Sequence, residues 1–417
     1  MSAVPPLPSF ESLDVDNRRV LVRVDFNVPL RGSSEQREVA DDTRIAAALP
    51  TLTSLLDRGA RLIVCSHLGR PKGKPDPAYS MTPVAARLSA LLKLPVALPD
   101  EVVGDGVTKL VNDSRAGSVV MLENLRFHAE EEKNDEAFAR ELLKLCDVYV
   151  NDAFGASHRA HASVVGVPSL IHDHAPGMLM ARELAALGKL VSDPEHPFVA
   201  VVGGAKVSDK LGVLVALTEQ LSAGDAVIIG GAMANSFLLA RGHELGASLV
   251  ERDRLGDCKR VFDKAEARDV RVLIPVDLRC GSGLDATAAT IVAVEAGVAG
   301  GMMALDIGPR TEALFAQAIA GAKTVFWNGP MGVFENPAFA SGTMAMAAAV
   351  ASCPGFTVVG GGDSVAALNA SGREADIDHV STGGGASLEF IEGRELPGVT
   401  ALVAPPPIVD FNAENEP

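Results

Sequence analysis

Residues 19–27 read RVLVRVDFN, an apolar run that ends abruptly on charged and polar side chains. Similar short runs rich in Val, Ile and Leu recur along the chain, separated by longer Ala- and Leu-rich stretches with helical patterns. The runs are RVLVRV, RLIVC, SVVML, DVYV, FVAVV, AVIIG, RVLIPV, TVFW and FTVVG. Such alternation indicates βαβ units and parallel sheets. Because ligands bind beyond the carboxyl ends of strands in these sheets, the residues after each run are the candidates for a site.

Composition narrows the class of protein. The 417 residues are enough for two or three domains, and aromatic residues make up only 4%. The net charge of −16 disfavours nucleic acid and anionic lipid as partners. The five cysteines form no CxxC pair, and the N-terminus shows no signal-peptide pattern, so we expect a reducing, cytoplasmic location without a membrane span. The cysteines are Cys65, Cys146, Cys258, Cys280 and Cys353.

The pattern predicts an α/β protein with two doubly wound, Rossmann-like parallel-sheet domains. We expect residues 1–176 to form the first domain and residues 192–396 the second. Residues 177–191, GMLMARELAALGKLV, contain no proline and are expected to form a connector helix. Residues 397–417 form a tail whose Pro-rich, acidic end is expected to be extended or partly disordered.

In the first half, charged side chains follow the strands. His67, Arg70, Arg126 and Arg159, with His161 as a further member, come after four different runs that should converge. The planar guanidinium group pairs well with phosphate or carboxylate, so the set predicts an anion site. Each arginine alone could instead be a solvated residue in a surface salt bridge. The histidines also leave a metal site open, although no Cys or carboxylate spacing supports one.

Asp25 and Asn27 alternate on an extended segment and should therefore point the same way. They could hydrogen-bond a substrate hydroxyl or carboxylate. The alternative is that both cap the following turn, which is common for these residue types.

In the second half, glycines follow the strands, which suits close approach of backbone to a nucleotide. The segment GGAKVSDK, residues 203–210, places Lys206 and Lys210 four residues apart, on what is predicted to be the first turn of a helix. The segment does not fit a Walker A loop, and an ordinary surface lysine pair is the alternative.

GGGDS, residues 360–364, follows a strand and opens a helical pattern. Its glycines would let backbone amides reach phosphate oxygens, and Asp363 could hold Mg²⁺ between them. A Gly-rich turn with Asp363 as a helix cap is the alternative. GGG at 383–385 repeats the arrangement, whereas GSGLD at 281–285 lacks the third glycine of a dinucleotide fingerprint.

The chain resembles the phosphoglycerate kinase family from about Val20 to Pro397. The motifs that carry the resemblance occur in the family's order: RVDFNVPL, DDTRI, SHLGRP, ENLRF, SHRAH, GGAKVSDK, WNGPMGVFE, GGGDS and STGGGAS. The resemblance implies reversible transfer of the acyl phosphate of 1,3-bisphosphoglycerate to MgADP, giving 3-phosphoglycerate and MgATP in glycolysis and gluconeogenesis. It also implies a monomer whose active-site cleft closes by hinge bending, and a tail that returns toward the N-terminal domain.

The resemblance further assigns roles to individual residues. By resemblance, the phosphoglycerate is bound by Asp25, Asn27, Arg44, His67, Arg70, Arg126 and Arg159. The nucleotide would be bound by Gly204, Ala205, Lys210, Gly230, Gly231, Asn328, Glu335, Gly361, Gly362, Asp363 and Ser364. Glu335 should reach the ribose and Asp363 the metal. Arg44, Lys206 and Lys210 are the predicted catalytic residues.

The chemistry of the motifs agrees with such a transfer. Both possible nucleophiles, a carboxylate and a nucleotide phosphate, are ionised at neutral pH, so no general base is required. The step needs positioning and charge cancellation instead. Two other classes are alternatives: an NAD-dependent dehydrogenase, which the missing G-x-G-x-x-G opposes, and an inactive nucleotide-binding scaffold, which the full set of charged groups opposes.

Overall fold

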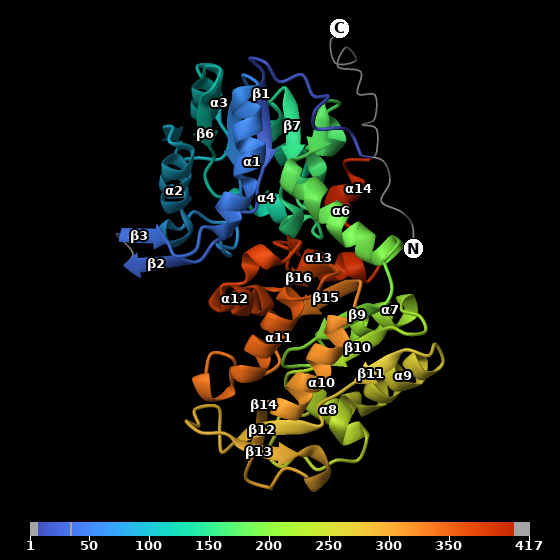
Figure 1. Cartoon of the computed structure of the whole chain (residues 1–417). Coiled ribbons are helices and arrows are strands. Elements are labelled where there is room, and N and C mark those ends of the chain that lie inside the picture. The colour runs from blue at the N-terminus through green and yellow to red at the C-terminus, as the bar shows by residue number, and fades with distance from the viewer. Residues whose placement is uncertain (1–6, 34–35, 404–417) are drawn as a thin grey trace. The chain divides into compact units, whose positions relative to one another are not determined.

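The computed structural model describes residues 7–33 and 36–403 (Figure 1). The chain divides into two compact units, which are described separately. The N-terminal unit comprises Ser2–Ala185 together with Glu395–Pro417, and the C-terminal unit comprises Ala186–Arg394. Among the described residues, no helix combines the length and the apolar character that a bilayer crossing requires.

The N-terminal unit is built on a six-stranded sheet in the order β5-β6-β4-β1-β7-β8. All neighbouring strands are parallel, and Val22 of the central strand β1 is in register with Val64 on one side and Val150 on the other. The strands are β1 (Arg19–Arg23), β4 (Arg61–Cys65), β5 (Val96–Ala97), β6 (Val119–Met121), β7 (Val148–Asn151) and β8 (His174–Pro176).

Helices pack on both faces of this sheet, and each face has its own apolar core. Val20 and Val22 lie in one core and Leu21 in the other, as expected when successive side chains of a strand point to opposite faces. The helices are α1 (Thr43–Asp57), α2 (Thr82–Leu92), α3 (Asp105–Asn112), α4 (Ala129–Glu132), α5 (Glu136–Leu143) and α14 (Pro397–Thr400). A hairpin of β2 (Leu30–Ser33) and β3 (Gln36–Val39) precedes α1.

The C-terminal unit contains a second six-stranded parallel sheet, in the order β11-β10-β9-β15-β16-β17. Strand order reverses between β9 and β15, which makes the carboxyl ends of these two strands the expected ligand position. The strands are β9 (Phe198–Val202), β10 (Ala226–Ile229), β11 (Arg271–Leu273), β15 (Thr324–Asn328), β16 (Phe356–Gly360) and β17 (His379–Val380).

The remaining elements of the C-terminal unit surround this sheet. A separate antiparallel sheet contains β12 (Asp277–Gly281), β13 (Thr290–Ala293) and β14 (Met303–Ile307), in the order β13-β12-β14. The helices are α7 (Leu211–Gln220), α8 (Met233–Ala240), α9 (Leu255–Glu266), α10 (Pro309–Ala320), α11 (Ser341–Ala351), α12 (Gly362–Ser371) and α13 (Gly385–Ile391).

The predicted fold class, two doubly wound parallel sheets with helices on both faces, is confirmed. Each of the nine predicted runs contributes a strand to one of the two parallel sheets. The strand formed by RVLIPV is shorter than the run, because it ends at Leu273. The sequence did not predict the edge strands β5, β8 and β17, the hairpin or the antiparallel sheet. The edge strands are two or three residues long, β13 is partly exposed, and charged residues interrupt the apolar runs of β12 and β14.

Helix α6 (Met178–Ser192) covers the stretch for which the sequence predicts a connector helix, and the boundary between the two units falls within it, after Ala185. Near the other end of the chain, Gly398 donates a backbone hydrogen bond to Ser157 at 2.9 Å, and Leu402 is buried in a core of the N-terminal unit. The predicted character of the end of the tail, from residue 404 on, lies outside the described residues.

Candidate functional site

A cluster of cationic and imidazole side chains lies at the carboxyl edge of the N-terminal sheet. His67 follows β4, Arg126 follows β6, and Arg159 and His161 follow β7. The charges of Arg126 and Arg159 both act on the two imidazoles, which shows that these segments converge. The predicted convergence of separate strand ends is therefore present in the structure.

One member of this cluster, Arg23, the last residue of β1, was not predicted from the sequence. Its side chain is completely buried and makes three hydrogen bonds. Nε donates to Ser163 Oγ at 2.9 Å, Nη1 to the Val24 carbonyl, and Nη2 to His67 Nδ1 at 3.1 Å. A charged residue inside an otherwise apolar strand is a signal in the sequence that could have identified it.

Glu131 of α4, a second buried charge that the sequence analysis missed, supports Arg23 through Ser163. Ser163 donates from Oγ to Glu131 Oε1 at 2.6 Å and from its backbone N–H to Oε2 at 2.9 Å. His161 Nδ1 lies 3.8 Å from Oε1 of the same carboxylate. Burial raises the pKa of Glu131, while the positive charge of Arg23 opposes that rise. A buried carboxylate thus supports the cluster of cationic and imidazole side chains.

Asn124 joins the segment after β4 to the segment after β6. Its side-chain amide donates to the carbonyls of Leu68 and Tyr79, at 2.7 and 2.9 Å, and its Oδ1 accepts from the N–H groups of Leu68 and Arg126, at 3.2 and 3.1 Å. Arg126 Nη1 in turn donates to the Gly69 carbonyl at 2.8 Å. These bonds fix Arg126 in place without using all five guanidinium donors.

Desolvation and mutual repulsion shape the electrostatics of the cluster. Burial first, and then three neighbouring guanidinium groups, hold the pKa of His67 well below its usual range. The same causes lower the pKa of His161 to about 3, and burial also lowers the pKa of Arg126. Both imidazoles are therefore neutral at physiological pH, and the positive potential comes from the arginines. Such a cluster favours an anion that brings compensating negative charge.

The remaining residues predicted to bind the phosphoglycerate lie close to this edge or on the surface. Asp25 Oδ2 forms an ion pair with Arg44 Nη1 at 2.8 Å, and Asn27 Oδ1 accepts from the Gly69 N–H at 2.9 Å. Asp25 Oδ1 also accepts from the Asn27 N–H at 3.3 Å, so the turn-capping alternative holds as well. Arg70 is exposed and extends the same segment beyond Gly69.

In the C-terminal unit, glycines allow the backbones after β9, β10 and β15 to meet. Gly204 donates to the Pro330 carbonyl at 3.0 Å, and Gly231 donates to the Met331 carbonyl at 3.1 Å. A Cβ on Gly231 would lie 2.5 Å from the Gly204 carbonyl oxygen and 2.8 Å from that of Pro330. A Cβ on Gly230 would overlap the Met331 side chain. These predicted nucleotide-site glycines therefore form one close-packed floor at the point where strand order reverses.

Polar residues gather beside this floor. Lys210 donates from Nζ to Asn328 Oδ1, and Asn328 donates from Nδ2 to the Gly360 carbonyl at 2.8 Å. The backbone N–H of Gly329 donates to Ser364 Oγ. Gly361 has φ +91°, a left-handed conformation that favours glycine, and precedes the first turn of α12, where Gly362 and Asp363 are exposed.

Charge links Lys210 to the start of α12. Burial lowers the pKa of Lys210, and the carboxylate of Asp363 acts in the opposite direction. Lys210, Asn328 and the Gly361–Ser364 segment are thus brought together in one place. Ala205, Lys206 and Glu335 are exposed on loops next to these strand ends.

The expectation that Lys206 and Lys210 share the first turn of a helix is wrong. Residues 204–210 form bends and turns, and α7 begins only at Leu211, with Lys210 as its N-cap residue. Ser208 holds the segment in this form by donating from Oγ to Glu251 Oε1 at 2.6 Å, while Val207 is buried. The two ammonium groups are therefore not paired by helical spacing.

Within residues 7–33 and 36–403, no group of three or more His, Cys, Asp or Glu side chains is arranged to hold a metal ion. Asp363 contributes a single exposed carboxylate at the N-terminus of α12. One carboxylate together with phosphate oxygens is a donor set that Mg²⁺ commonly uses, so the residue fits a metal that is bound with a nucleotide.

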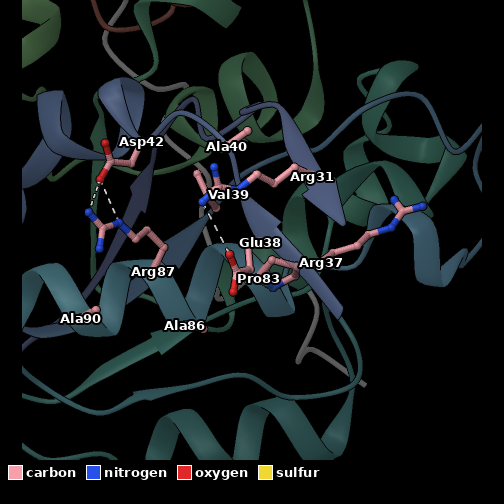
Figure 2. A pocket seen from close by; sticks show the side chains of 10 residues that line it. All are labelled: Arg31, Arg37, Glu38, Val39, Ala40, Asp42, Pro83, Ala86, Arg87 and Ala90. Carbon is pink, nitrogen blue, oxygen red and sulfur yellow. Dashed lines mark hydrogen bonds and ion pairs between the residues drawn. The ribbon is translucent and has the colours of Figure 1, made fainter. Parts of the chain in front are cut away.

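A hollow of about 520 Å³ lies between the β2–β3 hairpin and α2. Figure 2 shows two ion pairs in it, Arg87 with Asp42 and Arg31 with Glu38, whereas the third arginine, Arg37, donates to the Ala78 carbonyl. The Nε–Oδ2 distance of the first pair is 2.8 Å, and the closest N–O distance of the second is 3.7 Å. None of the predicted site residues lines this hollow.

Comparison with known proteins agrees with this geometry. The family model described as phosphoglycerate kinase matches residues 10–394. The chain is 54% identical over 398 residues to a phosphoglycerate kinase of Anaeromyxobacter sp. (strain Fw109-5), covering 95% of this chain and 99% of that protein. It is 53% identical over 395 residues to one of Moorella thermoacetica, covering 94% and 98%.

Solved structures of the same description share the fold. The phosphoglycerate kinase of Coxiella burnetii matches with a TM-score of 0.84 and 37% identity, covering 95% of this chain and 99% of that one. The enzyme of Pyrococcus horikoshii OT3 matches with a TM-score of 0.81 and 32% identity, covering 94% and 98%.

Proposed function

The chain belongs to the phosphoglycerate kinase family, and we propose how its residues divide the work of that reaction. The reaction is the reversible transfer of the acyl phosphate of 1,3-bisphosphoglycerate to MgADP, which gives 3-phosphoglycerate and MgATP. The observation that carries the proposal is the convergence of His67, Arg126 and Arg159 on one edge of the N-terminal sheet.

The N-terminal unit binds the phosphoglycerate in this proposal. Arg126 and Arg159 neutralise the terminal phosphate, since guanidinium groups pair with phosphate through two parallel hydrogen bonds. His67 adds a neutral N–H donor and Arg70 a further cation. Asp25 and Asn27 contact the hydroxyl and carboxylate of the glycerate.

The C-terminal unit binds the nucleotide. The adenine side of the nucleotide lies next to Ala205, against the close-packed backbones of Gly204, Gly230 and Gly231. The N-terminus of α12, which begins at the exposed Gly362 directly after Gly361, suits the phosphates, with Ser364 fixing the loop. Glu335 reaches the ribose, and Asn328 orients Lys210.

Mg²⁺ is proposed as the cofactor, bound with the nucleotide and held on the protein side by Asp363. When bound, the ion neutralises charge on the nucleotide phosphates. Lys210 lies close enough to Asp363 for the two charges to interact, so the ammonium group and the carboxylate can act on neighbouring phosphate oxygens.

No residue needs to take a proton in this reaction, because the attacking oxygen of either substrate is already ionised. The protein must instead align the two substrates and cancel charge on the group that moves. Arg44, Lys206 and Lys210 supply positive charge, and they come from two different units. We therefore propose that the units close for direct in-line transfer, with α6 as part of the hinge.

The test is an assay of the purified protein with 3-phosphoglycerate, MgATP and hydroxylamine to trap the acyl phosphate. We expect ADP release that requires all three components and stops when EDTA removes Mg²⁺. Exposed Arg115 lies outside the site, so Arg115→Ala should behave as the wild type. Absence of ADP release would refute the proposal and leave an inactive scaffold as the alternative. Reduction of NAD in a separate assay would indicate a dehydrogenase.

The proposal also includes a monomeric state and a cytoplasmic location, with no nucleic-acid or membrane partner. The net charge of −16 supports the last point, because such a surface repels polyanions. Light scattering at assay concentration tests the monomer, and cell fractionation tests the location. A stable dimer or a membrane-bound fraction would contradict these parts without affecting the assignment of the reaction.

A further inference from the structure

Arg23 determines which nitrogen of His67 carries the proton. Arginine has five N–H donors and no acceptor, and its pKa keeps it charged. Since Arg23 Nη2 lies 3.1 Å from His67 Nδ1, this nitrogen must be the acceptor. The imidazole proton is therefore on Nε2, and a doubly protonated imidazolium is incompatible with the contact.

The rest of the network has one consistent set of donors and acceptors. Ser163 Oγ accepts from Arg23 Nε, so its single proton is given to Glu131, 2.6 Å away. The second Glu131 oxygen accepts the Ser163 N–H at 2.9 Å. Both carboxylate oxygens are then acceptors, as in the ionised form. Of these assignments, the acceptor role of His67 Nδ1 follows directly from the fixed chemistry of Arg23.

Burial makes this arrangement rigid. Arg23, Ser163 and Glu131 are each 0% exposed and His67 is 5% exposed, so water cannot replace the bonds that hold the imidazole. A buried polar group that loses its partner is costly, which keeps the ring in one orientation.

We propose that Arg23 is a positioning residue for the phosphoglycerate site: it fixes His67 as a neutral donor whose Nε2–H is directed to the bound substrate. The part concerning substrate rests on the proposed function, whereas the protonation state of His67 does not. The charged and titratable groups around the ring are Arg23, Arg126, Arg159 and His161, and all four oppose a positive charge on it. His67 therefore contributes the same hydrogen bond throughout the physiological pH range.

The first test needs no variant of Arg23. Nitrogen NMR of histidine-labelled enzyme without substrate, with the His67 signals assigned from His67→Gln, should show Nδ1 unprotonated and Nε2 protonated between pH 5 and 8. A protonated Nδ1, or titration of His67 within that range, would overturn the proposal. The outcome of this test does not depend on which substrate the enzyme uses.

The second test compares two substitutions of the histidine itself. The amide of glutamine reaches the position of Nε2, whereas that of asparagine reaches only the position of Nδ1. We expect His67→Gln to keep the KM for 3-phosphoglycerate within about threefold and His67→Asn to raise it about tenfold or more, the effect of losing a hydrogen bond to a charged ligand. Equal effects of the two substitutions would contradict the role of Nε2.

The third test separates position from charge at Arg23. Arg23→Met should raise the KM for 3-phosphoglycerate about tenfold with little change in kcat. The variant should also change the pH profile of that KM relative to the wild type, because His67 loses one of the charges that keep it neutral. Arg23→Lys keeps the charge but cannot reach Ser163 and His67 together, so it should not restore the wild-type KM.

Arg19→Met is the matched control for these variants. Arg19 opens the same strand but pairs with Asp147 at 2.6 Å, at the opposite end from His67. The pH profile of its KM for 3-phosphoglycerate should match that of the wild type. Full recovery of the KM in Arg23→Lys would show that charge alone matters and would overturn the positioning role.

Discussion

Arg44 Nη1 lies 2.8 Å from Asp25 Oδ2, so the arginine proposed to act on the transferring phosphoryl group is held by a carboxylate proposed to bind substrate. Arg44 is in α1, and Asp25 follows β1. The ion pair is only partly buried, with 36% of the arginine side chain exposed. The guanidinium is thus oriented at the sheet edge and still accessible to a ligand.

Arg44→Ala should lower kcat about a thousandfold or more, because loss of a charge clamp on the phosphoryl group is felt mainly in the transition state. The KM values for both substrates should change little. Arg44→Lys should recover only part of the activity, since a point charge does not reproduce the planar fork. Steady-state kinetics with both substrates varied provide the measurement.

The control for this prediction is Arg87→Ala, which removes an arginine from the nearby hollow, where it pairs with Asp42 (Figure 2). Its kinetics should be close to those of the wild type. If Arg44→Ala kept a nearly normal kcat and raised the KM for 3-phosphoglycerate strongly, Arg44 would be an ordinary binding residue.

Arg126→Ala and Asp363→Asn should separate the two substrates. Arg126→Ala removes a phosphate contact and should raise the KM for 3-phosphoglycerate by about 10- to 100-fold, as expected for a hydrogen bond to a charged group. Asp363→Asn should instead weaken use of MgATP. A rise in the KM for ATP alone in Arg126→Ala would show that the two sites are wrongly assigned.

Gly231→Ala should destabilise the protein and impair nucleotide binding. The residue has φ +66°, and an added Cβ would meet backbone atoms of Gly204 and Pro330 that cannot move independently. We expect about 1–2 kcal/mol for the left-handed conformation and about 1–3 kcal/mol more for overpacking. Denaturant unfolding and the KM for ATP measure the two effects.

Gly242→Ala is the matched control for the glycine prediction. It also has a positive φ, +92°, but nothing lies within 4 Å of an added Cβ. Gly242→Ala should therefore show only the conformational cost, with an unchanged KM for ATP. Equal destabilisation by both substitutions would mean that the close backbone approach at Gly231 is unimportant.

Asp152 should make the stability of the N-terminal unit depend on pH. Its Oδ1 accepts from the N–H groups of Leu179 and Met180 in the first turn of α6, at 2.9 and 3.1 Å. Burial raises the pKa of Asp152 from 3.8 to about 6. The folded state thus binds its proton more tightly than the unfolded state, and the contribution of this group to stability is lost as pH rises from about 4 to 6.

Asp152→Asn keeps the Oδ1 acceptor and removes the titration. Relative to the wild type, the free energy of unfolding of this variant should increase by about 3 kcal/mol as pH rises through that window, the equivalent of a shift of about two pKa units. The difference between the two unfolding curves isolates this group from the other carboxylates. A constant difference across pH would show that the pKa of Asp152 is not raised.

Much of the architecture could be read from the sequence. The buried strands are recognisable in the sequence as continuous runs of Val, Ile and Leu. The rule that ligands bind at the carboxyl ends of strands identified His67, Arg126 and Arg159 before the distances between them were known. The prediction for Lys206 and Lys210 failed because the Ser208–Glu251 contact, between residues 43 positions apart, holds that segment in turns.

Taken alone, the sequence determined the two parallel sheets and the kinds of side chain that follow each strand, because periodicity and strand-end chemistry are local properties. Only the tertiary structure decided that Arg23 meets His67 and that Glu131 compensates it. Arg23 and His67 are 44 positions apart in the sequence, and Ser163 is 32 positions from Glu131. These contacts depend on which charges burial forces together. The cost of leaving a buried charge unpaired is a property of the packed interior, so it has no counterpart in a linear pattern.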